Sequence, residues 1–140
     1  MEEIAALDGG RFPGWARTGA TFKAAADTAG SANPVCRFYI GPTLGDSHFF
    51  SASPIECAAT AAAFPSLVLE TPAAMYLALP DVATGLCATG QPPIYRLWNR
   101  RPGSNHRYTT DRAARDRMAA QGYVVEGYGA DPVAMCAAAP

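Results

Sequence analysis

The sequence predicts an α+β fold made of pseudo-repeats of small antiparallel β-sheets, with one short helix in each repeat and disulfide bonds that staple the units. Two copies of one sequence pattern, at residues 34–53 and 93–111, predict the repeats. Thirteen glycines and twelve prolines indicate many turns and short elements rather than a helical bundle. Four scattered cysteines, an even number with no C-x-x-C pair, favour two disulfides over a zinc site.

The length and composition restrict the class of protein. The 140 residues are the size of one ordinary domain, and the chain is 49% hydrophobic and 16% charged, as expected for a folded chain. The net charge of −1 excludes a nucleic-acid binder that works by bulk positive charge. No apolar run approaches the roughly 18 residues of a membrane span, so we expect none.

We expect a single domain over residues 1–140, divided into the back half of a truncated repeat (1–32) and two repeats (33–90 and 91–140). The copies should pack around a common aromatic core, because each unit is too small to bury a core of its own. Since the front half of the first copy is missing, we expect the chain to be part of a longer polypeptide. Residues 80–92 are expected to form a linker.

The truncated copy is predicted to contain a helix and a closing strand. Residues 2–7 are typical of the end of a helix, which the glycines at positions 9 and 10 terminate. Residues 15–19 align with the strand predicted near the end of the second repeat, and Phe22 begins the closing strand. Residues 24–33 are rich in small side chains and are expected to form a linker.

Each full repeat is predicted to begin with two strands joined by a turn, followed by a helix. Arg37 and Arg96 mark the first strand, and the second strand carries a histidine. Ser53 and Asp111 lie where an N-cap belongs, each just before an alanine-rich stretch, and Pro54 suits the first helical position.

Two further extended segments are predicted after each helix. They cover residues 67–70 and 75–79 in the first repeat, and 123–127 and 133–136 in the second. Their β-branched and aromatic residues favour strand over helix in such short segments.

The repeated pattern consists of the segments CRFYI (36–40) and HFFS (48–51), then YRLWN (95–99), HRYT (106–109) and EG (126–127). At these residues the sequence resembles a bacterial repeat domain of unknown function, whose hallmark is a Y-R-F-Y-N strand, an H-F-Y-T-T strand, a helix and a W-x-x-E-G strand. The first copy has cysteine and isoleucine where tyrosine and asparagine are usual, and its cysteine indicates a strand recruited into a disulfide.

The resemblance implies an exported protein. Domains of this kind are typically C-terminal modules of exported bacterial hydrolases, adhesins and surface proteins, which implies an accessory role and a location that is secreted or at the cell surface. An oxidising location agrees with the predicted disulfides. The acidic start of the chain has no apolar segment, so the signal peptide is expected outside this chain. The resemblance brings no catalytic residues.

Four cysteines allow three disulfide connectivities. We expect Cys36–Cys57, which would join a strand to the helix that follows it, and Cys87–Cys136, which would close a loop of about fifty residues and add about 3–4 kcal/mol. The alternative is that all four cysteines are reduced and act as small buried hydrophobic residues.

The repeated arginines are predicted to form ion pairs. An arginine on a mostly apolar strand face is costly unless it is paired. We expect a salt bridge from Arg37 and from Arg96 to Glu70 or Glu126, one in each repeat. The alternative is an arginine that binds a ligand carboxylate or a sugar hydroxyl.

The two histidines, His48 and His106, occupy equivalent positions in the repeat. We expect each to donate a hydrogen bond within its repeat and to pack against an aromatic ring. A catalytic role would need a nucleophile or a base partner. The sequence has neither a G-x-S-x-G motif nor the paired carboxylates of a glycoside hydrolase. We therefore expect no catalytic residue, no cofactor and no metal site.

Aromatic side chains recur beside polar residues in the predicted strands, and we interpret them as exposed. They are Trp15, Tyr39, Phe50, Tyr95, Trp98 and Tyr108. A flat aromatic face beside hydrogen-bonding groups suits a sugar ring or a peptide, whereas the alternative is that these rings form the core. The candidate ligand-binding residues are Arg96, Trp98, Asn99, His106 and Tyr108.

The second repeat also carries a basic cluster. Its members are Arg100, Arg101, Arg107, Arg112, Arg115 and Arg117. Their spacing predicts a solvated face with local ion pairs, and the alternative is a site for an acidic polysaccharide or an anionic cell-wall polymer.

The sequence therefore predicts a non-catalytic accessory binding module of an exported bacterial protein, which recognises a carbohydrate or a cell-envelope polymer. The alternative is a structural or spacer domain of a surface protein, with no small ligand. A small hydrolase is a third and minor interpretation.

Overall fold

The computed structural model describes residues 2–13, 18–28 and 30–140. The helices are α1 (Glu2–Asp8), α2 (Pro54–Ala63) and α3 (Arg112–Ala120). The strands are β1 (Ala32–Pro34), β2 (Cys36–Ile40), β3 (Ser47–Ser51), β4 (Val68–Thr71), β5 (Tyr76–Ala78), β6 (Pro93–Trp98), β7 (His106–Thr109), β8 (Val124–Glu126) and β9 (Met135–Cys136). The predicted α+β class, with small antiparallel sheets and short helices, is confirmed.

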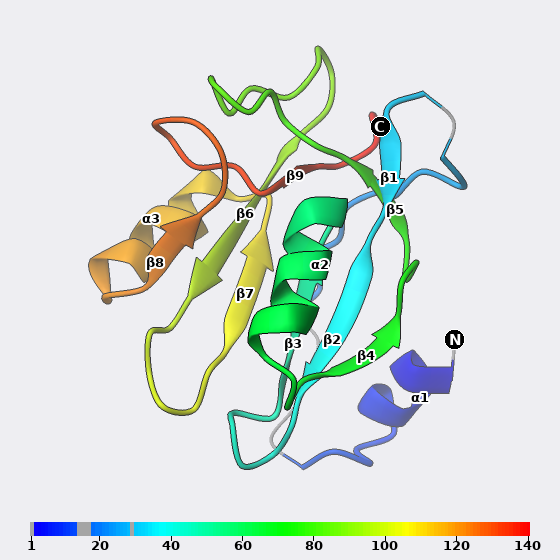
Figure 1. Ribbon diagram of the computed structural model, residues 1–140, viewed down its shortest axis with the longest axis vertical. Coiled ribbons are helices and arrows are strands. Elements are labelled where there is room, and N and C mark those ends of the chain that lie inside the picture. Colours follow the sequence, from blue (N-terminus) through cyan, green and yellow to red (C-terminus); the bar gives the residue numbers. More distant parts are fainter. Residues whose placement is uncertain (1, 14–17, 29) are drawn as a thin grey trace.

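Two groups of elements have the same order along the chain and the same strand pairing. In the first unit (residues 36–71), β2 lies between β3 and β4, and α2 connects β3 to β4. In the second unit (residues 93–126), β6 lies between β7 and β8, and α3 connects β7 to β8. Figure 1 shows the two units beside each other. The shared order and pairing are what two repeats would produce. The boundaries of the predicted repeats remain a prediction.

Strands β1, β5 and β9 form a sheet that continues into the second unit. Its order is β1-β5-β9-β6-β7, and β9 pairs with β5 through Ala78 and Cys136 and with β6 through Ile94 and Met135. Strand β9 therefore lies between β5, which follows the first unit, and β6, the first strand of the second unit (Figure 1).

The prediction of a linker at residues 24–33 is wrong in part. Ala25 forms a β-bridge with Tyr76, and β1 begins inside the expected linker and pairs with β5. Small residues have low β propensity, but this pairing uses backbone groups, such as the amide of Ala25 that donates to the Tyr76 carbonyl at 2.9 Å. Phe22 does not begin a strand. Trp15, in the segment predicted to match the second repeat, lies outside the described residues.

Both predicted helix N-caps are confirmed. The Ser53 hydroxyl accepts a hydrogen bond from the amide of Glu56 at 3.2 Å, and Pro54 occupies the first turn of α2. The Asp111 carboxylate accepts from the amide of Ala113 at 2.8 Å. These bonds satisfy amide groups that have no partner within the helix, so they determine where α2 and α3 begin.

Replacing Asp111 by alanine should lower the free energy of unfolding by about 1 kcal/mol, because an amide of the first turn of α3 loses its acceptor. Urea unfolding at neutral pH measures this loss. Asp111→Ser keeps an acceptor at the same place and should stay within a few tenths of a kcal/mol of the parent. Equal losses in the two variants would contradict the capping role.

The core is divided into three clusters, so the prediction of one common aromatic core is wrong in part. One cluster lies between the units and is mainly aliphatic: Val35, Ala52, Leu77, Ile94, Ala134, Met135 and Ala137. A second, around Phe38 and Phe49, lies within the first unit, and a third, around Tyr95 and Leu97, lies under α3. Each unit buries a small core of its own because its helix covers one face of its sheet.

Both expected disulfides are present. Cys36–Cys57 joins β2 to α2, and Cys87–Cys136 joins the segment before β6 to β9. Disulfides persist in oxidising compartments, so both bonds are consistent with an extracellular environment. Within the part of the chain that the structure describes, no helix is long and apolar enough to cross a membrane.

Candidate functional site

Each unit contains a triad of arginine, glutamate and histidine side chains. In the first triad (Arg37, His48, Glu70), the guanidinium Nε donates to the carboxylate at 2.6 Å, and the imidazole Nε2 lies 3.1 Å from the same oxygen. In the second triad, the corresponding distances from Arg96 and His106 to Glu126 are 2.9 and 3.5 Å. The predicted salt bridge in each repeat is therefore confirmed.

The strand register explains how the triads form. Arg96 of β6 lies opposite Glu126 of β8, so both side chains leave the same face of the sheet. In the first unit the register of β2 and β4 shifts between Arg37 and Phe38, which leaves Glu70 as an extra residue of β4. A β-bulge changes the direction of the side chain at the extra residue, so the Glu70 carboxylate reaches Arg37.

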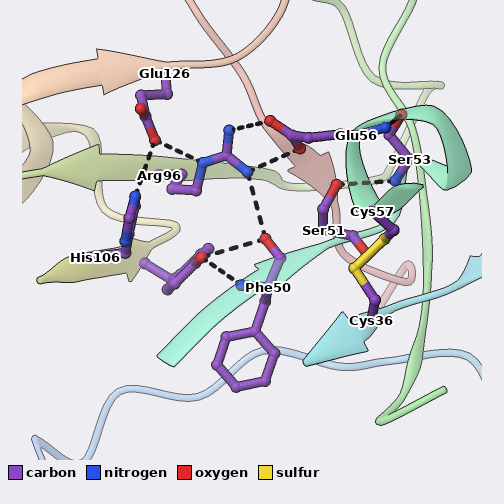
Figure 2. A network of polar contacts seen from close by, with 10 residues as sticks. Cys36, Phe50, Ser51, Ser53, Glu56, Cys57, Arg96, His106 and Glu126 are labelled. Carbon is purple, nitrogen blue, oxygen red and sulfur yellow. Dashed lines mark hydrogen bonds and ion pairs between the residues drawn. A yellow bond between two sulfur atoms is a disulfide. The ribbon is translucent and has the colours of Figure 1, made fainter. Parts of the chain in front are cut away.

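The second triad is connected to the first unit through Glu56 of α2. The two terminal nitrogens of Arg96 donate to the two carboxylate oxygens of Glu56 at 2.9 and 2.6 Å, and one of them also donates to the Phe50 carbonyl at 3.4 Å. Figure 2 shows this guanidinium between the carboxylates of Glu56 and Glu126. Its side chain is only 6% exposed. Arg96 therefore joins the two units by a buried, bidentate ion pair.

Glu56 is available for this contact because of the local structure at the start of α2. The sequence Ser53-Pro54-Ile55-Glu56 has the spacing of a capping box, in which the glutamate usually accepts from the amide of the N-cap residue. Here the Ser51 hydroxyl accepts from the Ser53 amide at 3.0 Å instead. The Glu56 carboxylate is thus free to reach across to β6.

Neighbouring groups keep both carboxylates ionised despite their partial burial. Burial alone would raise the pKa of Glu56, but the hydrogen bond and charge of Arg96 hold the pKa below its usual value. Burial likewise opposes ionisation of Glu126, and the hydrogen bond from His106 together with the charge of Arg96 lowers its pKa. Both groups are therefore carboxylates at neutral pH.

These lowered pKa values predict that the folded state loses stability in acid. A carboxyl group whose pKa is lower in the folded than in the unfolded state stabilises the fold when the pH is above its unfolded-state pKa, near 4.5. This contribution is lost as the pH falls through the folded-state pKa. Urea unfolding between pH 7 and pH 3 should show a smaller loss of stability in Glu56→Gln than in the parent. Asp116→Asn, which removes a surface carboxylate of α3, serves as the control, and an equal change in both variants would contradict the prediction.

A pocket of about 500 Å³ lies between the helix-covered face of the first unit and the triad-bearing face of the second. Its lining residues are Ile40, Leu44, Phe49, Glu56, Thr60, Phe64, Ser66, Leu67, Arg96, Trp98, Pro102, Ser104, His106 and Glu126. Apolar side chains form most of its wall, and the second triad with Glu56 supplies its charged groups. We call it the inter-unit pocket.

The turns of the two units meet at one side of this pocket. The amide of Ser104 donates to the Leu44 carbonyl at 2.6 Å. A Cβ atom at Gly45, whose φ is +140°, would lie 2.2 Å from the Ser104 carbonyl oxygen, so the close approach of the turns requires glycine there. The side chain of Asn105 also donates to the Ser47 hydroxyl at 3.2 Å.

The structure brings three of the five candidate ligand-binding residues into the inter-unit pocket: Arg96, Trp98 and His106. Asn99 instead organises the turn after β6, where its side chain donates to the Gly103 carbonyl at 2.7 Å and accepts from the Asn105 amide at 3.0 Å.

Tyr108 lies outside the pocket lining. Its hydroxyl accepts from the amide of Phe50 at 2.8 Å and donates to the Phe50 carbonyl at 3.2 Å. Burial raises the pKa of the phenol, so the hydroxyl stays neutral and can make both bonds. Tyr108 of β7 therefore hydrogen-bonds to the backbone of β3.

The interpretation of the aromatic residues as exposed is wrong, because Tyr39, Phe50, Trp98 and Tyr108 are partly buried, and it fails most clearly for Tyr95. Its ring is buried under α3 with Leu97, on the face of β6 opposite Arg96. Trp98 remains half-buried in the pocket wall, and its indole N–H donates to the Ser104 hydroxyl at 3.1 Å. A period of two along β6 separates these rings onto opposite faces, and the sequence alone does not reveal which face α3 covers.

The chemistry of the inter-unit pocket follows from which groups remain open to a ligand. All three nitrogens of Arg96 donate to protein oxygens, so its main role is to hold two carboxylates in place. The side chains of Glu56 and Glu126 are 36% and 27% exposed and can accept further hydrogen bonds. His106 packs edge-on against Phe49, and its Nδ1 is buried and has no hydrogen-bond partner among the described residues, so the carboxylates are the groups more open to a ligand.

The basic cluster of the second repeat is confirmed in part as a source of local ion pairs: the pair of Arg115 with Asp116 is local, as the spacing predicts, whereas Arg112 pairs with Asp131, beyond β8. Arg112 lies 2.8 Å from Asp131, and Arg115 lies 2.7 Å from Asp116. Arg117 is a looser neighbour of Asp111, at 3.9 Å. In the described ranges, no group of three or more histidine, cysteine, aspartate or glutamate side chains is arranged to hold a metal ion.

Comparison with known proteins gives one family. The family described as a domain of unknown function (DUF5648) matches residues 6–133. Both triads and every residue that lines the inter-unit pocket lie inside the matched range. No curated protein and no solved structure matches the chain.

Proposed function

The chain belongs to the family described as a domain of unknown function (DUF5648), and we propose that it is a non-catalytic accessory binding module that recognises a polysaccharide. The observation that carries the proposal is the inter-unit pocket. Its volume of about 500 Å³ is within the range of small-molecule sites, and apolar walls surround a few charged groups.

A sugar unit fits this combination of surfaces. One face of a pyranose ring is apolar and stacks on a flat aromatic side chain, and its hydroxyl groups donate to carboxylate oxygens. Trp98 and Phe64 supply aromatic surface at the pocket, and Glu56 and Glu126 supply acceptors. Because Arg96 holds both carboxylates, the acceptors are oriented before a ligand arrives, which reduces the entropic cost of binding.

The balance of exposed charge favours a neutral or amino sugar over an acidic one. The accessible charged groups of the pocket are carboxylates, whereas the Arg96 side chain is almost completely enclosed. An acidic polysaccharide would bring its charges against Glu56 and Glu126, which is unfavourable in a partly desolvated pocket. This argues for a neutral glycan of the cell envelope or of an external substrate.

The proposed context is an exported bacterial protein, in which the module is one part of a longer polypeptide at the cell surface or outside the cell. The two disulfides support an oxidising location. In that context a polysaccharide-binding module would keep a partner domain close to its polymer.

The test is binding of the oxidised domain to immobilised chitin, cellulose, xylan, mannan and peptidoglycan. Phe64→Ala is the most informative variant, because Phe64 is 57% exposed and its loss should leave the fold intact. We expect it to weaken binding about fivefold, and Trp98→Ala to weaken binding at least about tenfold. Trp98→Phe should retain most of the affinity if ring stacking dominates.

Phe22→Ala is the matched control, since Phe22 is also an exposed phenylalanine but lies outside the pocket lining. It should bind as the parent does. Failure of the parent to bind any of the five polymers, with the fold intact, would overturn the proposal and favour a spacer domain. Binding that Phe64→Ala and Trp98→Ala leave unchanged would exclude the inter-unit pocket as the site.

A further inference from the structure

We propose that the first triad forms a second sugar-binding site, so that one domain engages a polysaccharide at two places. This inference rests on the proposed function. The inference extends the proposed function, because the inter-unit pocket alone would give the module only one sugar-binding site.

A second pocket, of about 440 Å³, lies over the first triad. Its lining residues are Leu7, Phe12, Arg37, Tyr39, Asp46, His48 and Glu70. Leu7 of α1 and Phe12, from the segment after it, supply apolar surface, and β2, β3 and β4 supply the aromatic and charged groups. We call it the N-terminal pocket.

The two pockets have equivalent groups at equivalent positions of their sheets. Tyr39 follows Arg37 by two residues and lies opposite His48 in the register of β2 and β3. Trp98 follows Arg96 by two residues and lies opposite His106 in the register of β6 and β7. Each pocket therefore has an aromatic ring next to an imidazole.

Each pocket also has a glutamate carboxylate, which contacts the arginine and the histidine of the same unit. In the N-terminal pocket this is Glu70, whose side chain is 33% exposed. The partly exposed carboxylate can accept from sugar hydroxyls, as proposed for Glu126 in the inter-unit pocket. Both pockets therefore offer a sugar an aromatic ring, an imidazole and a carboxylate.

The N-terminal pocket uses the face of β2 that the disulfide does not occupy. Cys36, Phe38 and Ile40 are buried on the face toward α2, whereas Arg37 and Tyr39 alternate with them and face the pocket. Recruitment of Cys36 into a disulfide therefore leaves the sugar-binding groups of this strand in place.

The N-terminal pocket is also organised before binding. The Tyr39 hydroxyl donates to the Asp46 carboxylate at 2.7 Å, which fixes one end of the ring. The Tyr39 and His48 rings lie 5.4 Å apart, and His48 lies 6.1 Å from Phe50. Fixed aromatic and charged groups in a concave site are typical of ligand binding.

Two sites on one domain change how the module binds a polymer. The two pockets use opposite faces of the sheet formed by β2, β3 and β4, so only a polymer long enough to pass round the edge of this sheet can occupy both. Its second segment then meets the other site at a raised effective concentration. Affinity for a long polymer should then exceed affinity for a hexasaccharide by on the order of 10²-fold. Loss of either site should remove most of this gain.

The experiment measures how many sites one domain offers. Chitohexaose, cellohexaose, xylohexaose and mannohexaose are titrated into the isotope-labelled parent, and the imidazole signals of His48 and His106 are followed by NMR. Both histidines should shift with the same sugar. Calorimetry with that sugar should give close to two sites in the parent and one in Tyr39→Ala, with Tyr39→Phe as the control that keeps the ring.

Shifts confined to His106, with one site in the parent, would overturn the second site and leave the proposed function standing. Shifts confined to His48 would support the N-terminal pocket and remove the inter-unit pocket as a sugar site. Binding of none of the four hexasaccharides, nor of their parent polymers, would overturn both proposals. The parent measurement does not depend on whether Tyr39→Ala folds.

Discussion

Replacing Arg96 by methionine should lower the free energy of unfolding by about 3–5 kcal/mol. Methionine retains much of the length of the side chain but removes the cation between Glu56 and Glu126. Both carboxylates would then remain in the pocket without their shared partner, and two like charges in a partly desolvated site repel each other. The loss arises from these unpaired charges more than from the missing contact.

The first triad provides the matched control for this prediction. The Arg37 side chain is 25% exposed, against 6% for Arg96, so water screens its ion pair with Glu70. Arg37→Met should therefore cost about 1 kcal/mol or less in urea unfolding. Adding Glu56→Gln to Arg96→Met should restore part of the lost stability. A smaller loss in Arg96→Met than in Arg37→Met would contradict the central position of Arg96.

Removing the Cys87–Cys136 disulfide should have the second large effect. The bond spans 49 residues, and the loop-closure relation assigns about 4 kcal/mol to a loop of this length. It holds β9, which pairs with both β5 and β6, so its loss should weaken the sheet that continues into the second unit. The measurement is urea unfolding of Cys87→Ala/Cys136→Ala.

The shorter disulfide serves as the comparison. Cys36–Cys57 spans 21 residues, for which the same relation gives about 3 kcal/mol. Cys36→Ala/Cys57→Ala should therefore be less destabilised than the variant without the longer bond. The opposite order would show that local strain or packing of Cys36, and not loop closure, dominates the contribution of these bonds.

The parts of the fold that the sequence predicts are those that depend on local patterns. The alternation of residues along β2 and β6 places Arg37 and Arg96 on faces where a carboxylate is needed, and Glu70 and Glu126 supply it. Ser53 and Asp111 mark helix starts by their hydrogen-bonding chemistry. These features can be predicted without knowing how the two units are oriented.

The parts that the sequence does not predict depend on contacts between units. Glu56 has the spacing of a capping-box residue, but nothing local indicates that its carboxylate bonds to Arg96 instead. Asn99 and Tyr108 have the residue types of a binding site, yet one makes a turn and the other bonds to the backbone of Phe50. Composition identifies groups that can bind a ligand, and tertiary contacts decide which of them remain available.

The central claim is that a neutral sugar occupies the inter-unit pocket against Trp98. The most direct measurement is the indole N–H signal of Trp98 in an NMR titration of the oxidised, ¹⁵N-labelled domain with the four hexasaccharides. Assignment by comparison with Trp98→Phe separates this signal from that of the second tryptophan. We predict that the Trp98 signal shifts with at least one sugar and saturates. A sugar that binds while the Trp98 signal stays unchanged would contradict the account.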